Sequence, residues 1–468
     1  MFSSEAWLAN PSSGFYNGEA TRSLRFDKAS SSYAIRQNST ATDAQKWTLS
    51  VWLKRTTLGA EQGILGSGST AEYVRFESDD TIRYRLYTSS AQQISMITNA
   101  VFRDTTNFFH FVCAVDLSNT TDNDKVIMYA NGTRLTLGTN TTTTTDTFDS
   151  LMNANTLYWN LGRFSGYFGG YMSDVHIIDG QQLTPTSFAE SKNGAWIAKK
   201  FSGGSYGNNG ARLEFKQTGD GSSTASASTI GADTSGNNNH FLDANVNAHD
   251  SNMPDSPENN FAILNTLHIM GSPTFSEGNL KLTGSGTDYD RSYATIGLTT
   301  GKWYAEFYFV SGDDRGIFGV VREDSLGLAT SSNYIGSQAN DYGMDFRARA
   351  KNNGSNTFDE TNFDTGDIGL LCFDIDNGKL WFGRRDVSGS TTIWYDSSGN
   401  NNGDPSAGSN PTYTFTATGY TWYIGCHDYN GTTIIANFGQ DGSFAGAITS
   451  QGASDSNSIG DFNYIESG

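Results

Sequence analysis

Two aspartates in one strand-like run are the residues whose types best suit hydrolysis of a glycosidic bond. That reaction needs two carboxyl groups, about 5 Å apart in a retaining enzyme and further apart in an inverting one. Asp174 and Asp179 lie in the run YMSDVHIIDG. Residues separated by an odd number of positions on a strand point to opposite faces, so these carboxylates are not expected to converge. We therefore expect no catalytic residues, and a structural hydrogen-bonding role for Asp174.

Metal binding is the next chemistry that the residue types allow. The six histidines lack the spacing of a metal site, and no nucleophile elbow, phosphate-binding loop or dinucleotide fingerprint is present. The spacing Asp374-x-Asp376-x-Gly378 resembles the start of a calcium loop. However, glycine occupies its fifth position and Arg385 its twelfth, where a bidentate glutamate is required. No EF-hand is expected, and no metal site is predicted.

The segment CFDIDNGKLWF is better explained as a β-hairpin with Asn377-Gly378 at its tip. A two-residue type I′ turn needs two positive φ values, which asparagine and glycine supply. Such a turn pairs Ile375 with Leu380 and places both on a core-facing side of the strand pair.

A second hairpin is predicted in VIMYANGTRLTL, with its turn at Asn131-Gly132. This turn pairs Met128 with Leu135 and Val126 with Leu137. Short strands separated by turn signals indicate a β-sandwich.

Several oxygen-rich loops leave calcium binding open. Residues 233–239, DTSGNNN, recur as residues 396–402, DSSGNNN. Asp, Ser, Gly and Asn are ordinary turn residues, but their oxygen atoms also suit a calcium ion or a sugar. The loop DLSNTTDNDK, with Asp116, Asp122 and Asp124, presents the same choice between a solvated hairpin connection and a calcium site. Calcium is thus the only cofactor that the sequence leaves open.

Surface binding remains, and three groups of residues could provide it. Lectin-like sites combine an aromatic platform with Asp and Asn in loops, because sugar C–H faces stack on rings while hydroxyl groups need planar acceptors. The candidate binding residues are Trp159, Arg163, Phe164 and Tyr167 near Asn160, then Tyr334, Asp341 and Tyr342, and finally Asp428 and Tyr429 with Asn430. Ordinary loop packing is the alternative explanation for each group.

The elements that position these residues are expected to be strands. The chain has 468 residues with 52 Gly, 7 Pro and 13% aromatic residues, a composition that favours strands and turns over helices.

A net charge of -19 without a basic block argues against nucleic-acid binding. Because no run of 18 apolar residues is present, membrane insertion is not expected. Cys113, Cys372 and Cys426 lie in apolar runs and are expected to be small buried hydrophobes.

The predicted fold class is all-β, with two β-sandwich (jelly-roll) domains joined by a Gly/Ser/Asn-rich bridging segment. The predicted parts are an N-terminal attachment segment (1–20), a first sandwich (21–193), the bridging segment (194–272) and a second sandwich (273–468). Runs such as WTLSVWLKR and NFFHFVCAVDL alternate with a period of two, as strands with one buried face do. The bridging segment is expected to wrap the neighbouring domains rather than to be a flexible spacer. Its expected anchors are Phe201, Tyr206, Leu213, Phe215, Phe241 and Phe261.

Three stretches of the chain resemble known families. The motifs RSLRFDKASSSYAI, WTLSVWLKR, FFHFVCAVDL, VIMYANGTRLTLG and YFGGYMSDVHIIDGQQLTPTSF are similar, in this order, to laminin G-like jelly rolls of the concanavalin A type, over roughly residues 20 to 190. The motifs GKWYAEFYF, GIFGVV, DTGDIGLLCFDIDNGKLWFGRRD and IIANFGQDGSF resemble a SPRY domain. The bridge DTSGNNNHFLDANVNAHDSNMPDSPENNFAILN resembles a segment that links these two modules in structural proteins of tailed, particularly marine, bacteriophages.

The resemblance implies a non-enzymatic virion protein, a tail fibre, appendage or capsid decoration at the virion surface that presents lectin-like sandwiches for host-surface adhesion. Its implied partners are other virion proteins, further copies of itself in a homo-oligomer or lattice, and a host-surface glycan or protein. Two alternatives stay open: a carbohydrate-binding lectin outside a phage particle, and a concanavalin A-like glucanase. In glucanases of that fold the two carboxylates come from one strand and lie two to four residues apart, unlike Asp174 and Asp179.

Overall fold

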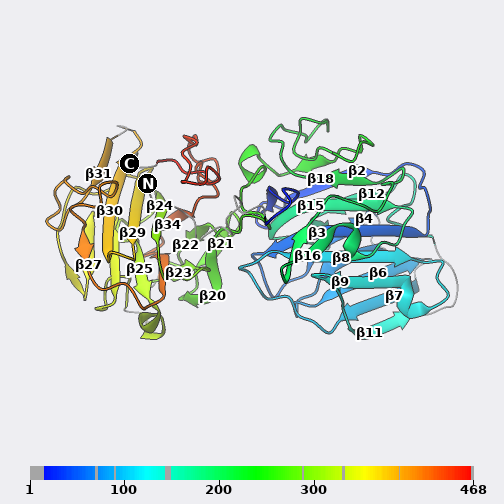
Figure 1. The fold of residues 1–468 in the computed structure, drawn as a ribbon, viewed down its shortest axis with the longest axis horizontal. Helices are drawn as coiled ribbons and strands as arrows, with labels where there is room; N and C mark the ends of the chain where they lie inside the picture. Colours follow the sequence, from blue (N-terminus) through cyan, green and yellow to red (C-terminus); the bar gives the residue numbers. More distant parts are fainter. Residues whose placement is uncertain are drawn as a thin grey trace. The chain divides into compact units, whose positions relative to one another are not determined.

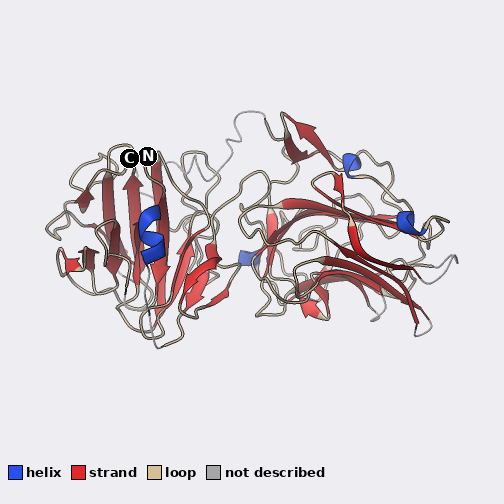
Figure 2. Ribbon diagram, turned by 90° about the horizontal axis from the view of Figure 1, so that it is seen from below, coloured by secondary structure: helices blue, strands red, loops and turns tan. Residues whose placement is uncertain are grey.

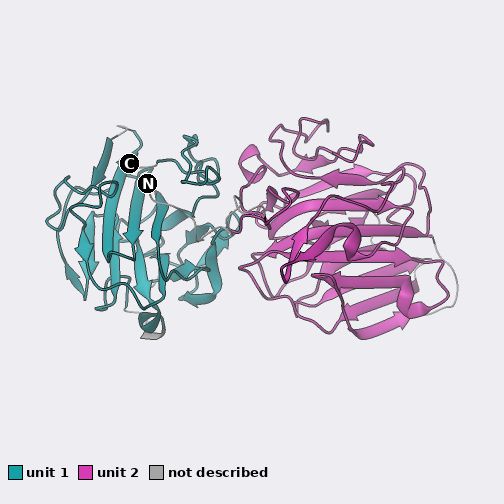
Figure 3. Cartoon of the chain, viewed as in Figure 1, with its two compact units in different colours: residues 1–10, 261–468 teal, residues 11–260 magenta. Residues whose placement is uncertain are grey.

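Strands dominate the whole molecule (Figures 1 and 2). The computed structural model describes residues 15–68, 72–88, 91–142, 149–286, 289–328, 333–388 and 391–464. These residues form two compact units, an N-terminal unit of residues 15–260 and a C-terminal unit of residues 261–464 (magenta and teal in Figure 3). With 3% of the residues in helices and 43% in strands, the predicted all-β class is confirmed.

The N-terminal unit is a sandwich of two antiparallel sheets, called sheet A and sheet B. Sheet A has the order β1-β15-β3-β8-β9-β10, with β18 beside β15. Its strands are β1 (Ser23–Phe26), β3 (Lys46–Arg55), β8 (Phe109–Asp116), β9 (Val126–Ala130), β10 (Thr133–Arg134), β15 (Gly170–Asp179) and β18 (Ala211–Leu213). Sheet B has the order β11-β7-β6-β5-β4-β12-β2-β19. Its strands are β2 (Tyr33–Gln37), β4 (Gln62–Ser67), β5 (Glu72–Phe76), β6 (Ile82–Thr88), β7 (Ala91–Thr98), β11 (Leu137–Thr142), β12 (Tyr158–Leu161) and β19 (Leu242–Ala244).

Short elements complete this unit. Two small hairpins pair β13 with β14 and β16 with β17, and single turns of helix occur in three loops. Their bounds are β13 (Arg163–Phe164), β14 (Gly166–Tyr167), β16 (Ala189–Lys192), β17 (Ala195–Ala198), α1 (Asp122–Lys125), η2 (Pro185–Ser187) and η3 (Ala248–Asp250).

Alternation along the strands builds the core between sheets A and B. Every second residue of β3 and β8 points inward, as their sequences predict. The core residues from these two strands are Trp47, Leu49, Val51, Leu53, Phe111, Cys113 and Val115. Cys113, Cys372 and Cys426 are buried, which confirms the expectation that they pack as small hydrophobes.

Residues 194–260 pack onto the sheets of the N-terminal unit. Strand β18 extends sheet A and β19 extends sheet B, while Phe215 and Phe241 enter the main core. Phe201 and Tyr206 cover the outer face of sheet A. The division between the two units therefore falls after residue 260, within the predicted bridging segment of residues 194–272.

Two buried ion pairs hold the end of the segment 194–260 against sheet A. Arg25 lies 2.9 Å from Asp250, and the Lys54 ammonium lies 3.0 Å from Asp255, with every one of these side chains at most 7% exposed. Removing one partner of such a pair leaves the other charge buried and unpaired, which typically lowers the stability of the folded state by about 3–5 kcal/mol. These pairs therefore fix the position of residues 250–255 relative to β1 and β3.

The C-terminal unit is a second antiparallel sandwich, made of sheets C and D. Sheet C has the order β20-β23-β33-β25-β26-β27-β28. Its strands are β20 (Leu264–Met270), β23 (Arg291–Ala294), β25 (Ile317–Arg322), β26 (Asp341–Asp345), β27 (Arg349–Asn352), β28 (Ser355–Asn356) and β33 (Trp422–His427). Sheet D has the order β21-β22-β34-β24-β29-β30-β31, with β32 beside β30. Its strands are β21 (Thr274–Ser276), β22 (Lys281–Thr283), β24 (Lys302–Ser311), β29 (Ile368–Asp374), β30 (Lys379–Asp386), β31 (Thr391–Trp394), β32 (Tyr413–Thr414) and β34 (Thr433–Asn437), and the 3-10 helix η4 spans Glu323–Leu328.

The hairpin of β29 and β30 forms, but its predicted register is wrong. Asp374 pairs with Lys379, so the loop holds four residues instead of two. Gly378 has a φ of 62°, whereas Asn377 has no positive φ. The cause is the Asp374 carboxylate, which accepts the backbone N–H of Asn377 at 3.0 Å and its side-chain N–H at 2.8 Å, and so ends the strand early.

The hairpin of β9 and β10 has the predicted turn. Asn131 and Gly132 have φ values of 46° and 79°, as a type I′ turn requires, and the Leu135 N–H donates to the Met128 carbonyl at 2.8 Å. The pairing does not continue to Leu137, because that residue joins β11 in sheet B.

No helix in the described part of the chain is both long and apolar enough to cross a membrane.

Candidate functional site

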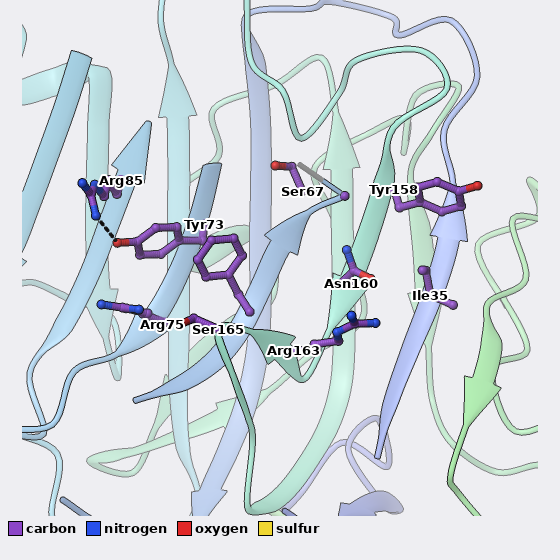
Figure 4. Close-up of a pocket in the computed structure, with 11 residues that line it drawn as sticks. Ile35, Ser67, Tyr73, Arg75, Arg85, Tyr158, Asn160, Arg163 and Ser165 are labelled. Atoms are coloured by element: carbon purple, nitrogen blue, oxygen red, sulfur yellow. Dashed lines mark hydrogen bonds between the residues drawn. The ribbon is translucent and has the colours of Figure 1, made fainter. Parts of the chain in front are cut away.

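A groove of about 500 Å³ lies on the outer face of sheet B (Figure 4). Five strands and the hairpin of β13 and β14 contribute to its wall. The lining residues are Ile35, Ser67, Gly68, Tyr73, Arg75, Arg85, Tyr158, Asn160, Arg163, Phe164 and Ser165.

Strand register sets the floor of this groove. One row of paired residues crosses five neighbouring strands, and its members share a face because paired residues in adjacent strands point the same way. The row is Ile35, Asn160, Gly66, Tyr73 and Arg85. The residues that alternate with them, such as Val74 and Leu86, fill the core instead.

The small hairpin reaches this floor because two glycines leave space for it. A Cβ on Gly63 would lie 2.0 Å from the backbone nitrogen of Phe164, and one on Gly66 would lie 2.7 Å from its ring. Phe164 therefore stacks on Tyr73, with ring centroids 4.1 Å apart and planes 22° apart. Tyr73 is only 2% exposed, so the ring that faces the groove is that of Phe164, supported from behind.

Three arginines line the groove, and a fourth, Arg83, lies on the same face of β6 as Arg85; they differ in their partners. Arg75 is neutralised by two carboxylates, since it lies 2.6 Å from Glu61 and 2.9 Å from Glu77. Arg83 lies 3.7 Å from the same Glu77. Arg85 and Arg163 form no ion pair within the described part of the chain; they pack on aromatic rings instead.

The structure brings together part of the first predicted group. Asn160, Arg163 and Phe164 line the groove, and Tyr167 lies near Arg163, 5.9 Å from its guanidinium. Trp159 does not line it. This residue is fully buried and donates its indole N–H to the Met152 carbonyl, because it alternates with Asn160 along β12 and so faces the core.

Sequence reasoning missed the residues of β5 and β6. Tyr73, Arg75, Arg83 and Arg85 fall on one face of EYVRF and IRYRLYT. That face carries arginine and tyrosine, which are enriched at binding interfaces relative to the rest of a protein surface. The alternation was therefore a usable signal, although only the strand order and register show that this face continues across β4 to β12.

The C-terminal unit gathers part of the other two predicted groups. Tyr334 and Tyr429 lie on either side of Tyr289, at centroid distances of 5.7 and 4.8 Å, and the Arg315 guanidinium sits 3.7 Å above Tyr429. Tyr342 lies apart from them, because it faces the interior of the sandwich and stacks on Phe415 at 4.0 Å.

The predicted carboxylates of this unit hold loops in place. Asp341 accepts the N–H of Gln338 at 2.6 Å. Asp428 accepts the N–H groups of Asp290 and Gly431, each at 2.9 Å, and the latter closes a turn through Asn430. Burial raises the pKa of Asp341 to about 7 and that of Asp428 to about 6.

The repeated loops use their first aspartate as a turn cap. Asp233 accepts the N–H groups of Ser235 and Asn239, each at 2.8 Å, and Asp396 accepts those of Ser398 and Asn400 at 2.8 and 2.9 Å. A carboxylate surrounded by N–H donors has little capacity left for a cation. Both loops thus follow the turn interpretation of their sequence.

In the acidic loop, Asp122 and Asp124 pair with cations of the chain. They lie 3.2 Å from Lys125 and 2.8 Å from Arg134, respectively. Asp116 accepts the backbone N–H of Ser118 at 3.0 Å.

The two aspartates considered for hydrolysis have structural partners. Asp174 lies 3.1 Å from His176 and 2.8 Å from Arg212. Burial opposes its ionisation, but these two neighbours outweigh burial and lower the pKa of its carboxyl to about 2. Asp179 accepts the N–H groups of Thr42 and Asn209 at 2.8 and 3.0 Å.

A buried serine and histidine also lie within hydrogen-bonding distance, with Ser50 Oγ 2.7 Å from His110 Nε2. The indole N–H of Trp196 donates to His110 Nδ1 at 3.0 Å. Since Nδ1 is the acceptor, Nε2 carries the proton and donates to the serine, so this histidine cannot activate the hydroxyl group as a base. Burial lowers the pKa of His110 to about 3 and keeps it neutral.

Comparison with known proteins supports the fold of the groove-bearing unit. Residues 27–187 match the family model of the concanavalin A-like lectin/glucanases superfamily, laminin G type. This confirms the resemblance for the first sandwich, and the whole groove lies within the matched range. A search of curated proteins finds no match.

Two of the solved structures that are similar to this chain are the following. The SPRY domain of human HERC1 is 16% identical, with a TM-score of 0.28, and the match covers 38% of this chain and 97% of that one. A heptameric SAP-like pentraxin from Limulus polyphemus is 12% identical, with a TM-score of 0.27 and coverage of 35% and 78%.

Substituting Gly63 tests how the groove is built. We expect Gly63→Ala to destabilise the protein by about 2 kcal/mol or more, because the backbone of the β13–β14 hairpin must move away. Gly138→Ala in β11 is the control, since its Cβ would meet only the side-chain oxygen of Asn99. Thermal unfolding of both variants measures the difference, and equal melting temperatures would contradict the tight packing of the hairpin.

Asp341 predicts a pH dependence of stability. Its pKa is raised to about 7 in the folded chain, so between about pH 4 and 7 the folded state holds a proton that the unfolded state has lost, and stability falls as pH rises through this window. Asp341→Asn resembles the protonated form at every pH. Relative to wild type it should gain stability between pH 4.5 and 7.5, by up to about 4 kcal/mol.

The control for this measurement is Asp364→Asn, whose carboxylate is 90% exposed. Its melting temperature relative to wild type should not change between the two pH values. If Asp341→Asn behaves in the same way, burial does not shift the titration of Asp341.

Proposed function

We propose that this protein binds glycans without hydrolysing them, and that its N-terminal unit holds the sugar in the groove on sheet B. The observation that carries the proposal is the Phe164 ring, stacked on Tyr73 at 4.1 Å and flanked by Asn160 and Arg163 in the same groove. A rigid ring with planar polar groups beside it is the combination that sugar recognition requires. The match of residues 27–187 to a lectin and glucanase superfamily supports the same class of ligand.

The chemistry of the lining favours binding over hydrolysis. Glycoside hydrolysis needs a pair of carboxyl groups on either side of the bond. The described residues that line the groove include neither aspartate nor glutamate. Glu61, which accepts a hydrogen bond from the lining residue Ser165, forms an ion pair with Arg75. A sugar in this groove would thus meet rings, an amide and guanidinium groups.

The ring of Phe164 is also preorganised. The backbone of its hairpin rests on Gly63, and Ser165 reaches Glu61 at 3.3 Å. Binding therefore does not have to order this side chain, which saves part of the entropy that a mobile loop would lose.

Glycan binding is tested with a panel of neutral and acidic polysaccharides, by titration calorimetry or array binding. Phe164→Ala should weaken binding about tenfold or more, because an aromatic contact is worth roughly 1–2 kcal/mol. Tyr420→Ala is the matched control, since Tyr420 is an aromatic residue of the C-terminal unit that is 38% exposed. Binding that survives Phe164→Ala unchanged would contradict the assignment of the groove.

We further propose that the chain is a structural protein at the surface of a tailed bacteriophage virion, where many copies or a homo-oligomer present the groove to a host glycan. The order of a laminin G-like module, the bridge of residues 233–265 and a SPRY-like module supports this setting. Its hairpin-rich sandwiches and net charge of -19 suit an exposed particle component, which must resist aggregation. The second candidate is a lectin of the same ligand class outside any particle, and the family match favours both equally.

Mass spectrometry of purified particles distinguishes these settings. The virion proposal expects the chain as a stoichiometric component that stays with the particles through a density gradient. Recovery in the soluble fraction alone would favour the free lectin.

A further inference from the structure

Two arginines of the groove lack the counter-charge that their neighbours have. Arg75 and Arg83 share Glu61 and Glu77. Arg85 and Arg163 make no ion pair in any of the ranges that the structure describes. In a chain with 49 acidic and 30 basic residues, carboxylates are the more abundant partner, so an unpaired guanidinium beside a groove is unexpected.

Both guanidinium groups are held by aromatic faces. Arg85 lies 4.0 Å from the Tyr87 ring centroid and donates to the Tyr73 hydroxyl at 3.2 Å. Arg163 lies 4.6 Å from the Tyr33 ring centroid. Stacking occupies the flat face of a guanidinium but leaves its N–H edge free for a planar anion.

Arg85 retains a specific unmet donor. Its Nε is buried and has no hydrogen-bond partner among the described residues. A buried donor without a partner destabilises the folded chain. A small shift of the Arg85 side chain toward the groove that it lines would bring this N–H to a ligand oxygen.

The two cations lie at different places around the stacked rings. Figure 4 shows Arg85 beside the hydroxyl end of Tyr73, and Arg163 beside Asn160 on the other side of the aromatic pair. A single monosaccharide on Phe164 would have one cation on each side. A polysaccharide with an acidic group on successive sugars would contact both Arg85 and Arg163.

We propose that the groove selects acidic polysaccharides, with Arg85 and Arg163 each pairing with a carboxylate or sulfate on sugars that flank the one stacked on Phe164. This inference rests on the proposed glycan binding. The negative charge of the whole chain opposes a polyanion, so the selectivity comes from these two local cations and weakens as salt screens them.

The test measures binding of the full chain to alginate, carrageenan and dextran, which are a polyuronic acid, a sulfated galactan and a neutral glucan. At low salt the acidic polymers should bind at least tenfold more tightly than dextran, and the better of the two identifies the acidic group. Arg85→Gln and Arg163→Gln should each weaken acidic binding about tenfold. Arg134→Gln is the control, since Arg134 is a half-exposed arginine of the same unit paired with Asp124, and it should change nothing.

Each other outcome has a defined meaning. If dextran binds as well as the acidic polymers and only Phe164→Ala weakens binding, acid selection is wrong and the glycan site stands. If acidic binding survives both glutamine substitutions, the arginines do not carry it and the inference falls. If no polysaccharide binds, the proposed function itself fails. Should Arg85→Gln unfold the chain, the more exposed Arg163 decides the matter, because Arg163→Lys keeps the charge and should recover part of the affinity that Arg163→Gln loses.

Discussion

The groove depends on the close approach of the β13–β14 hairpin to sheet B. Only a residue without a Cβ fits at Gly63, where the Phe164 backbone would otherwise lie 2.0 Å away. This contact places the Phe164 ring on Tyr73 and turns a flat sheet face into a groove with a wall. A sheet face that carries side chains in every position would remain a convex, solvated surface. The proposed ligand-binding chemistry of the unit thus depends on the missing Cβ atoms of Gly63 and Gly66.

Each sandwich also contains a fully buried glutamate, Glu72 or Glu306, that has no ion-pair partner among the described residues. Glu72 accepts hydrogen bonds from Trp47, Tyr84 and Ser150, and Glu306 accepts from Tyr304, Asn437 and the backbone of Asn463. Burial raises the pKa of Glu306 to about 7. In each unit the glutamate links its strand to a loop that follows later in the chain, β5 to Ser150 and β24 to Asn463. These loops are therefore held by buried hydrogen bonds, which leaves the outer sheet faces available for binding.

The sequence predicted which segments form strands and turns better than it predicted the register and order of those strands in the sheets. Period-two alternation identified β3 and β8 correctly, and Asn131-Gly132 has the predicted turn. The β29–β30 register was wrong because the Asp374 side chain caps the loop, an interaction that alternation does not encode. The sequence predicted both Trp159 and Phe164 as surface aromatic residues. Trp159 instead points from β12 into the core, whereas the β13–β14 hairpin places Phe164 on the outer face. Arg85 was missed because its place on the groove face, three strands from β12, depends on the order of strands that lie far apart in the chain.

For the proposed binding of acidic glycans, Arg85 and Arg163, which make no ion pair with any described residue, matter more for selectivity than for the stability of the fold. An exposed ion pair contributes only about 0–1 kcal/mol, so pairing Arg163 with a carboxylate of the chain would have stabilised the protein very little. A guanidinium stacked on a ring in a groove is different, because the ring excludes water from one face and raises the strength of any charge-assisted hydrogen bond on its edge. Arg75 shows the alternative, since its two carboxylates leave no charge for a ligand. The arrangement therefore separates arginines that hold the sheet together from arginines that remain available to an anion.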